Sequence, residues 1–341
     1  MKIARYALAL SCLAAAGLGT MRTEAAAAVA GDAHVPTFRA PWTRDDEMAR
    51  VAQAAFGHSG MLRAVFVDAS RPVPLPLEWA ARPAGDVWYE WRPQSGTRPP
   101  MLLGTSRLSL GLVAPAGGGI WTLHLSAGPW SQDVGALSVI TRVPFDAKRD
   151  GYLNGYHIGT YPTEGDPRGD VYDIPPGFIE VTPQNQDTRV SEHFRLRDFL
   201  TKDQADVWPK YLALDMRLVD KLELVIQELN AMGVRAERLS IMSGYRTPQY
   251  NAVGSENRAR LSRHMYGDAS DVWVDNDGNG LMDDLNGDGA IDDHDGDVIL
   301  RAVERVEAAY PDLTGGCGVY LSGDAHGPFV HIDARGFRAR W

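Results

Sequence analysis

Cysteine is scarce in this chain: there are two in 341 residues, and Cys12 falls in a short apolar stretch near the N-terminus. If that stretch is removed, Cys317 has no partner within the chain and cannot form an internal disulfide. We therefore expect packing or bound metal to stabilise the fold, with Cys317 as a small buried residue in a GGCGVY turn. Long hydrophobic runs are also missing after residue 30, which excludes a membrane-spanning helix there.

The first 30 residues are typical of a secretory signal peptide. Lys2 and Arg5 give a basic start, residues 6–17 are largely apolar, and an alanine run from Ala25 offers small-residue cleavage sites. We expect an exported protein, periplasmic or in the cell envelope. Lipid anchoring at Cys12 is the less favoured alternative, because ALSC lacks the leucine that usually stands three places before a lipidated cysteine.

Basic stripes are absent too, so nothing predicts nucleic-acid binding. The formal net charge of −10 is local, because residues 275–297 hold nine aspartates and no lysine or arginine. Without this stretch the chain would be close to neutral. Its length and 44% apolar content predict two domains, each with its own core.

Residues 60–145 are predicted to form an all-β, antiparallel, immunoglobulin-like sandwich domain after an N-terminal segment, 31–59. Short runs rich in β-branched and aromatic residues alternate there with Pro and Gly: LRAVFVD, VWYEWR, SRLSLGLV, IWTLHLS and ALSVITRV. Five runs are fewer than a full sandwich needs, so the topology stays open. A Gly, Pro and Asp-rich linker region follows at 146–187, and His157 within it is expected to pack rather than bind peptide.

Residues 188–341 are predicted to form an α+β domain with a small antiparallel sheet. Apolar residues recur at helical spacing over 215–233, and a second helix is expected over 298–309. Four segments are expected to be strands: 238–245, 270–274, 318–322 and 329–336.

Two histidines and an aspartate of this domain are candidate metal ligands. SRHMYGDASD contains His264 and Asp271, and a later VHID segment contains His331 and Asp333. Side chains alternate across a strand, so His331 and Asp333 should share one face. Three protein ligands with a fourth position left for water are typical of catalytic zinc. The alternative is that these are ordinary structural residues.

Four motifs, in order, resemble the M15 family of zinc D-alanyl-D-alanine carboxypeptidases and peptidoglycan endopeptidases. They are SGYRTPQYN at 243–251, SRHMYGDASD at 262–271, GGCGVY at 315–320 and FVHIDARGFRARW at 329–341. SEHFRLRDF, near residue 191, is similar to the opening of that domain. The likeness covers about residues 188–341 and includes nothing of the β domain.

The resemblance implies roles for individual residues. His264, Asp271 and His331 would bind zinc, and Arg246 would face the peptide or the developing oxyanion as a catalytic and substrate-binding residue. Ser243 and Tyr245 would shape the substrate pocket. Arg246 could instead form a structural pair with an aspartate, and Tyr245 could belong to the core.

The residue at the family's general-base position differs in this chain. Many relatives carry Glu or Asp three places before the last histidine, where this chain has Pro328. Asp333 is our first candidate for the base, and His326 and Asp324 are alternatives. Asp333 could equally orient a ligand histidine instead of accepting a proton.

The acidic insert at 275–297 is predicted to bind structural calcium, with a solvated acidic loop as the alternative. One EF-hand-type loop would use Asp284, Asn286, Asp288, Ala290, Asp292 and Asp295, with Gly289 at the turn. A second, overlapping loop would use Asp275, Asp277, Asn279 and Asp283. The two share residues and cannot both be complete EF-hands.

The expected function is therefore that of an exported, zinc-dependent peptidase acting on peptidoglycan stem peptides or cross-links. The β domain would position it on the wall or on an envelope protein. One alternative is a catalytically silent, calcium-dependent cell-wall binding protein. Another is a zinc peptidase that cleaves other peptides.

Overall fold

The computed structural model describes residues 48–51, 57–98, 103–135, 137–254, 258–323 and 326–341. The predicted signal peptide, the lipidation alternative at Cys12 and most of the 31–59 segment lie outside these ranges. Within them, no helix has both the length and the apolar character needed to cross a bilayer.

In the described ranges, the first sheet has eight strands. Its main path, in spatial order, is β12 (Lys210–Leu212), β11 (Gly177–Val181), β8 (Ser138–Pro144), β6 (Gly119–Ala127), β4 (Trp88–Pro93) and β5 (Ser106–Arg107). Two further strands branch from it, β2 (Ala64–Asp68) on β8 and β7 (Trp130–Asp133) on β6. A separate two-stranded sheet pairs β1 (Ala49–Val51) with β3 (Leu77–Trp79).

Four of the five predicted β runs form β2, β4, β6 and β8. The fifth, SRLSLGLV, yields only the short β5 before a 3-10 turn at Leu108–Leu110. The expected purely antiparallel pairing is wrong at one place, because β2 runs parallel to β8. Short alternating runs define faces but not partners, which is why this pairing was not foreseen. The immunoglobulin-like topology stays a prediction.

Strand pairing crosses both predicted domain boundaries. The 146–187 region contains a small hairpin of β9 (Tyr152–Leu153) and β10 (Tyr156–His157), followed by β11. β11 pairs with β8 on one side and with β12, from the predicted peptidase domain, on the other. His157 stacks on the Tyr152 ring at 4.2 Å, in line with a packing role.

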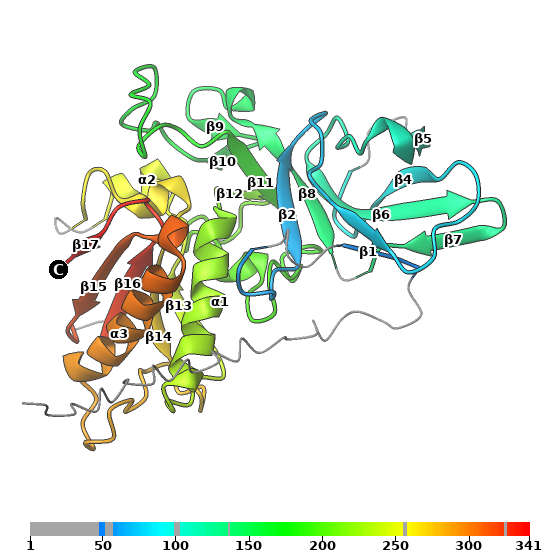
Figure 1. The fold of residues 1–341 in the computed structure, drawn as a ribbon. Helices are drawn as coiled ribbons and strands as arrows, with labels where there is room; N and C mark the ends of the chain where they lie inside the picture. The colour runs from blue at the N-terminus through cyan, green and yellow to red at the C-terminus, as the bar shows by residue number, and fades with distance from the viewer. Residues whose placement is uncertain (1–47, 52–56, 99–102, 136, 255–257, 324–325) are drawn as a thin grey trace, which may run out of the picture. The chain divides into compact units, whose positions relative to one another are not determined.

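The second sheet, as far as the structure describes the chain, has five strands in the order β13 (Leu239–Ser243), β14 (Ala269–Val274), β16 (Phe329–Asp333), β15 (Gly316–Tyr320) and β17 (Ala339–Arg340). Only β15 and β17 run parallel. Helices α1 (Met216–Ala231) and α3 (Asp293–Ala309) lie side by side on one face of this sheet (Figure 1). Buried aliphatic residues of both helices belong to the core that packs against the strands. The sheet and helices form α+β layers, but the prediction of an antiparallel sheet is wrong at its edge. The chain reverses after β16, so β17 runs in the direction of β15 and pairs with it in parallel.

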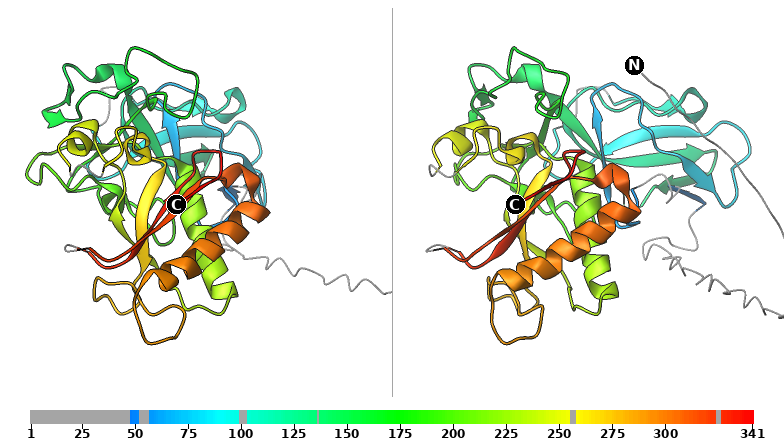
Figure 2. Two further views of the ribbon diagram at one scale, coloured as in Figure 1. Left: turned by 90° about the vertical axis from the view of Figure 1, so that its left-hand side faces the viewer. Right: turned by 60° about the vertical axis from the view of Figure 1, so that its left-hand side comes forward.

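The helix starts follow from capping. The Asp215 side chain accepts the Arg217 N–H and begins α1, close to the predicted start. α3 begins at Asp293 rather than Val298, because Asp292 caps it and Asp295 completes a capping box. The acidic stretch thus connects β14 to α3 at one end of the sheet (Figure 2). A short helix, α2 (Pro248–Ala252), follows β13.

Candidate metal centre and its cleft

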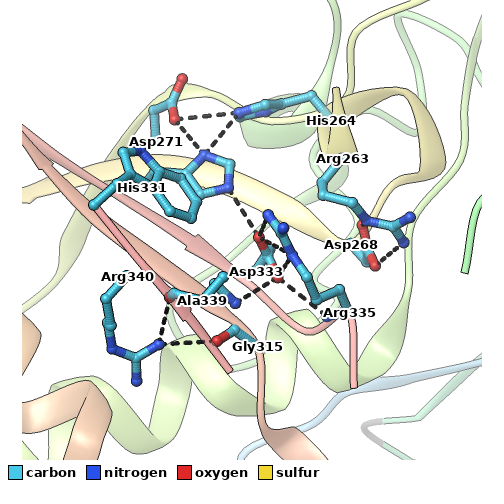
Figure 3. A network of polar contacts seen from close by, with 12 residues as sticks. Arg263, His264, Asp268, Asp271, Gly315, His331, Asp333, Arg335, Ala339 and Arg340 are labelled. Carbon is cyan, nitrogen blue, oxygen red and sulfur yellow. Dashed lines mark hydrogen bonds and ion pairs between the residues drawn. The ribbon is translucent and has the colours of Figure 1, made fainter. Parts of the chain in front are cut away.

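The three predicted zinc ligands come from three neighbouring elements. His264 lies in the 3-10 turn Arg263–Tyr266, Asp271 on β14 and His331 on β16. Asp271 and His331 are direct partners in the antiparallel β14–β16 register, which brings their side chains together on one face. The turn then places His264 beside them (Figure 3).

The donor atoms of these side chains converge. Nε2 of His264 lies 3.2 Å from Oδ1 of Asp271 and 3.2 Å from Nδ1 of His331, and the last two atoms are 3.0 Å apart. All three residues are buried. Tetrahedral zinc with bonds of about 2.0–2.1 Å holds its donor atoms roughly 3.3 Å apart. The spacing and the N, N, O donor set therefore fit a zinc ion.

Hydrogen bonds fix which ring nitrogen of each histidine faces the cluster. Nδ1 of His264 lies 2.7 Å from the Gly244 carbonyl, which can only accept, so Nδ1 carries the proton and Nε2 keeps its lone pair. Nε2 of His331 lies 3.1 Å from Oδ2 of Asp333. Contacts of this kind on the outer nitrogen are the usual way in which proteins orient metal-binding histidines.

Burial and charge set the protonation states of the first pair. Burial lowers the pKa of His264 and outweighs the attraction of Asp271, so this imidazole is neutral and able to donate to a metal. Burial alone would raise the pKa of Asp271. Its close contacts with the two imidazoles outweigh burial and hold that pKa well below its usual range.

Asp333 is placed as an orienting residue. Its carboxylate contacts the outer nitrogen of His331 and pairs with Arg335 (Figure 3). It also accepts the Gly316 N–H at 2.7 Å. Burial favours its neutral form, but hydrogen bonds from His331 and Arg335 lower its pKa well below the usual range. A general base works best with a pKa near the working pH. The geometry therefore favours the orienting alternative over the base role.

A buried polar network fixes the backbone at Asp333. Nζ of Lys221, on α1, donates to the Asp333 carbonyl and to Oε1 of Glu307, both at 2.7 Å. Glu307, on α3, also accepts the Gly315 N–H and pairs with Arg340. Both helices are thus tied to the end of the strand that carries His331.

Arg246 both pairs with an aspartate and faces the cleft, so both alternatives expected for it are present. Its guanidinium pairs with Oδ2 of Asp271, and Nε lies 2.7 Å from Oγ of Ser243, so the aspartate pairing weighed above is present. Arg246 and Ser243 both line the cleft beside the metal centre. Tyr245 does not line it. Its side chain is buried in the core and its hydroxyl lies 2.9 Å from that of Tyr161, in agreement with the core alternative.

The cleft has a volume of about 880 Å³ and opens beside the three candidate ligands. His326 lines it, and Nδ1 of His326 lies 2.8 Å from the Gly327 carbonyl. The carbonyl again requires the proton on Nδ1, which leaves Nε2 able to accept one. His326 is therefore the candidate base that the geometry keeps. Asp324 lies outside the described residues.

Sequence analysis did not assign several aromatic side chains near the metal centre to the site. Trp341 lies with its ring 5.3 Å from that of His331, and its Nε1 donates to the Tyr320 hydroxyl at 2.6 Å. Tyr320 stacks on Phe329 at 4.7 Å. Their spacing in the chain gave no signal, because the parallel β15–β17 pairing brings residue 341 back beside the metal strand.

No family model, no curated protein and no solved structure matches the chain. The M15 resemblance therefore rests on the four motifs. Two motif features have a local physical reason. Gly316 of GGCG leaves room for Asp333, since an added Cβ would lie 2.3 Å from Oδ2 of that residue. Cys317 beside it is buried and free, as expected, and burial raises its thiol pKa to about 12.

The acidic stretch forms two consecutive loops that share the same pattern of hydrogen bonds. The Asp284 carboxylate accepts the N–H groups of Gly287 and Gly289, and Asp275 accepts those of Gly278 and Gly280. Within each loop, backbone N–H groups also bond to the aspartate and asparagine side chains at the third and fifth positions.

The two loops differ in how their carboxylates gather. Donor oxygens of Asp275, Asp277 and Asp283 lie within 4.8 Å of one another, as a shared ion requires. Among the described residues, Asp284, Asp288, Asp292 and Asp295 do not form such a group. Asp292 and Asp295 instead cap α3. The first loop is therefore the better candidate for calcium.

Proposed function

We propose that the chain is a zinc-dependent peptidase of the M15 type that hydrolyses peptide bonds in peptidoglycan stem peptides or cross-links. The observation that carries the proposal is the convergence of His264 Nε2, Asp271 Oδ1 and His331 Nδ1 within 3.2 Å in the wall of a large cleft. Motifs alone predicted these three ligands, and the fold brings together residues far apart in sequence.

Zinc bound there would polarise a peptide carbonyl and lower the pKa of a bound water towards roughly 7. The chain's own residues supply the rest. Arg246 lines the cleft and, although burial lowers its pKa, a guanidinium stays charged and can donate to a carbonyl oxygen. His326 can hold a proton on Nε2, and Asp333 keeps His331 in its ligand orientation.

The test is digestion of purified muropeptides by zinc-loaded protein, compared with His331→Ala and with His58→Ala as a matched control. His58 is exposed and does not line the cleft. We expect new products from the wild type and from His58→Ala, and none from His331→Ala. If none of the three proteins releases a product, the proposal is rejected. Cleavage of ordinary L-peptides but not of muropeptides would assign another substrate.

A second candidate is a cell-wall binding protein without turnover. Pro328 at the family's base position, and the low pKa of Asp333, favour it. In that case the protein would sediment with murein in the presence of calcium while releasing no product.

We also propose that calcium binds the loop of Asp275, Asp277, Asn279 and Asp283. This loop starts where β14 ends, so a bound ion would brace the strand that carries Asp271.

A further inference from the structure

The cleft is strongly cationic. Among its described lining residues, Asp271 has the only acidic side chain, and it already belongs to the metal centre. Five cationic side chains line the same space: Lys202, Arg246, Arg258, Arg263 and Arg335. A cleft lined by one sign of charge concentrates ligands of the opposite sign. The cleft is therefore suited to an anionic ligand.

Three of these five cations are paired with buried aspartates, namely Arg246 with Asp271, Arg263 with Asp268 and Arg335 with Asp333. Arg258 and Lys202 differ, because neither forms an ion pair with any carboxylate in the part of the chain that the structure describes. Their charge is available to a ligand.

Arg258 is held in a defined position. Its Nη1 donates to the Tyr250 carbonyl at 2.7 Å, and the guanidinium lies over the Tyr250 ring at 4.4 Å. Gly254 permits the close approach, since a Cβ there would lie 2.2 Å from Cδ of Arg258. The contact uses Nη1 and leaves Nε and Nη2, a pair of donors that matches the two oxygens of a carboxylate.

Both cations lie near Arg246. Arg258 and Arg246 line the same cleft, and the Tyr250 residue that Arg258 contacts donates its N–H at 3.0 Å to Oγ1 of Thr247, the residue after Arg246. Lys202 follows Thr201, whose hydroxyl donates to the Tyr245 carbonyl at 3.1 Å and accepts the Thr247 N–H at 3.3 Å. These bonds fix Lys202 beside the segment that carries Arg246.

We propose that Arg258 and Lys202 form a carboxylate-binding subsite for the free C-terminus of a peptide whose scissile bond lies at the metal centre. The proposal rests on the proposed function for the position of that bond. The fork of Arg258 provides geometry and Lys202 adds charge, so the subsite favours peptides that end close to the cleaved bond over longer or amidated ones.

The experiment is a calorimetric titration of the zinc-loaded full chain with N-acetyl-D-alanyl-D-alanine and with its C-terminal amide. Product formation is followed in the same samples. We expect the wild type to bind the acid about tenfold more tightly than the amide. In the double variant Arg258→Gln/Lys202→Gln the two affinities become nearly equal. Arg258→Lys, which keeps the charge but loses the fork, falls between them.

Arg260→Gln is the matched control, because Arg260 is exposed, close in sequence and outside the cleft. It must keep the wild-type preference, and the thermal midpoints of all variants must show that they fold. Equal affinities in the wild type, or an unchanged preference in the double variant, overturn the subsite. So does a loss of preference in Arg260→Gln, which would show an effect of net charge alone.

The outcomes separate the subsite from the proposed function. A preference that is lost in the double variant, with no peptide cleaved by any form, keeps the subsite and rejects the peptidase. If the acid and the amide are both cleaved and bind with equal affinity, the peptidase is kept and the subsite is rejected.

Discussion

At the scale of single residues, the candidate centre depends on groups that motif reading identified and on others that it did not. His264, Asp271 and His331 were named from the sequence, and their donor atoms meet. Asp333 could be placed on the face of His331, but its role could not be decided. That depended on Arg335 and Gly316, which saturate its carboxylate. Such contacts form only on folding.

Asp333→Asn tests the orienting role. The variant keeps the shape but removes the charge that holds Nε2 of His331. We expect zinc affinity to fall about 10- to 100-fold, as for other partners of metal-bound histidines. Competitive zinc titration measures it, with the exposed Asp146→Asn as control. Unchanged zinc affinity, with loss of activity only, would return Asp333 to the role of base.

At the scale of elements, strands and helices were predicted better than their partners. The helical periodicity over 215–233 predicted α1. Four predicted strand segments correspond to β13, β14, β15 and β16 and lie close to the observed bounds. The start of α3 was misplaced, since aspartates expected to bind calcium cap the helix. The parallel pairs β2–β8 and β15–β17 could not be predicted, because such contacts depend on chain connections rather than on local pattern.

Gly316→Ala tests the close packing of β15 on the end of β16. The added Cβ would meet Oδ2 of Asp333 at 2.3 Å and Nη2 of Arg335 at 2.8 Å. Overpacking of this kind costs about 1–3 kcal/mol of unfolding free energy, and zinc affinity should fall with it. Urea denaturation measures the first effect. Gly117→Ala, where a Cβ meets nothing within 4 Å, should leave stability almost unchanged.

The link between α1 and the 190–199 segment should depend on pH. Glu223, buried on α1, accepts the backbone N–H of His193 at 2.9 Å and lies 2.7 Å from its Nδ1. This hydrogen bond raises the pKa of His193 against the opposing effect of burial. Because the folded pKa exceeds the unfolded one, the contribution is complete below about pH 6.5 and is lost as the pH rises through the folded value.

His193→Gln should therefore cost the most stability at pH 5.5 and progressively less towards pH 9. Urea denaturation of both proteins across this range gives the difference in unfolding free energy. A difference that stays constant, or that grows with pH, would show that the imidazole charge does not stabilise the fold.

At the scale of the whole molecule, the acidic loop is the feature with the widest expected effect. Its first part is tied to the core by Met282, which is buried, and by the Asp283 N–H, which donates to the Val274 carbonyl at 2.9 Å. An ion shared by Asp275, Asp277 and Asp283 would hold the end of β14. Calcium would then stabilise the folded chain by mass action.

Adding calcium to zinc-loaded, calcium-depleted protein should raise the melting temperature by about 4 °C at a hundred times the Kd. Magnesium should do much less, since it needs a smaller octahedral site. Differential scanning calorimetry measures the shift. Asp275→Asn/Asp277→Asn should abolish it, and an equal response in this variant would place the ion elsewhere.

The most direct test of the central claim is the position of zinc in a crystal of the loaded protein, located by anomalous scattering at the zinc absorption edge. We predict a peak bonded to Nε2 of His264, Oδ1 of Asp271 and Nδ1 of His331, with its remaining position open to the cleft. A zinc peak away from these atoms, or one closed by a fourth protein ligand, would contradict the account.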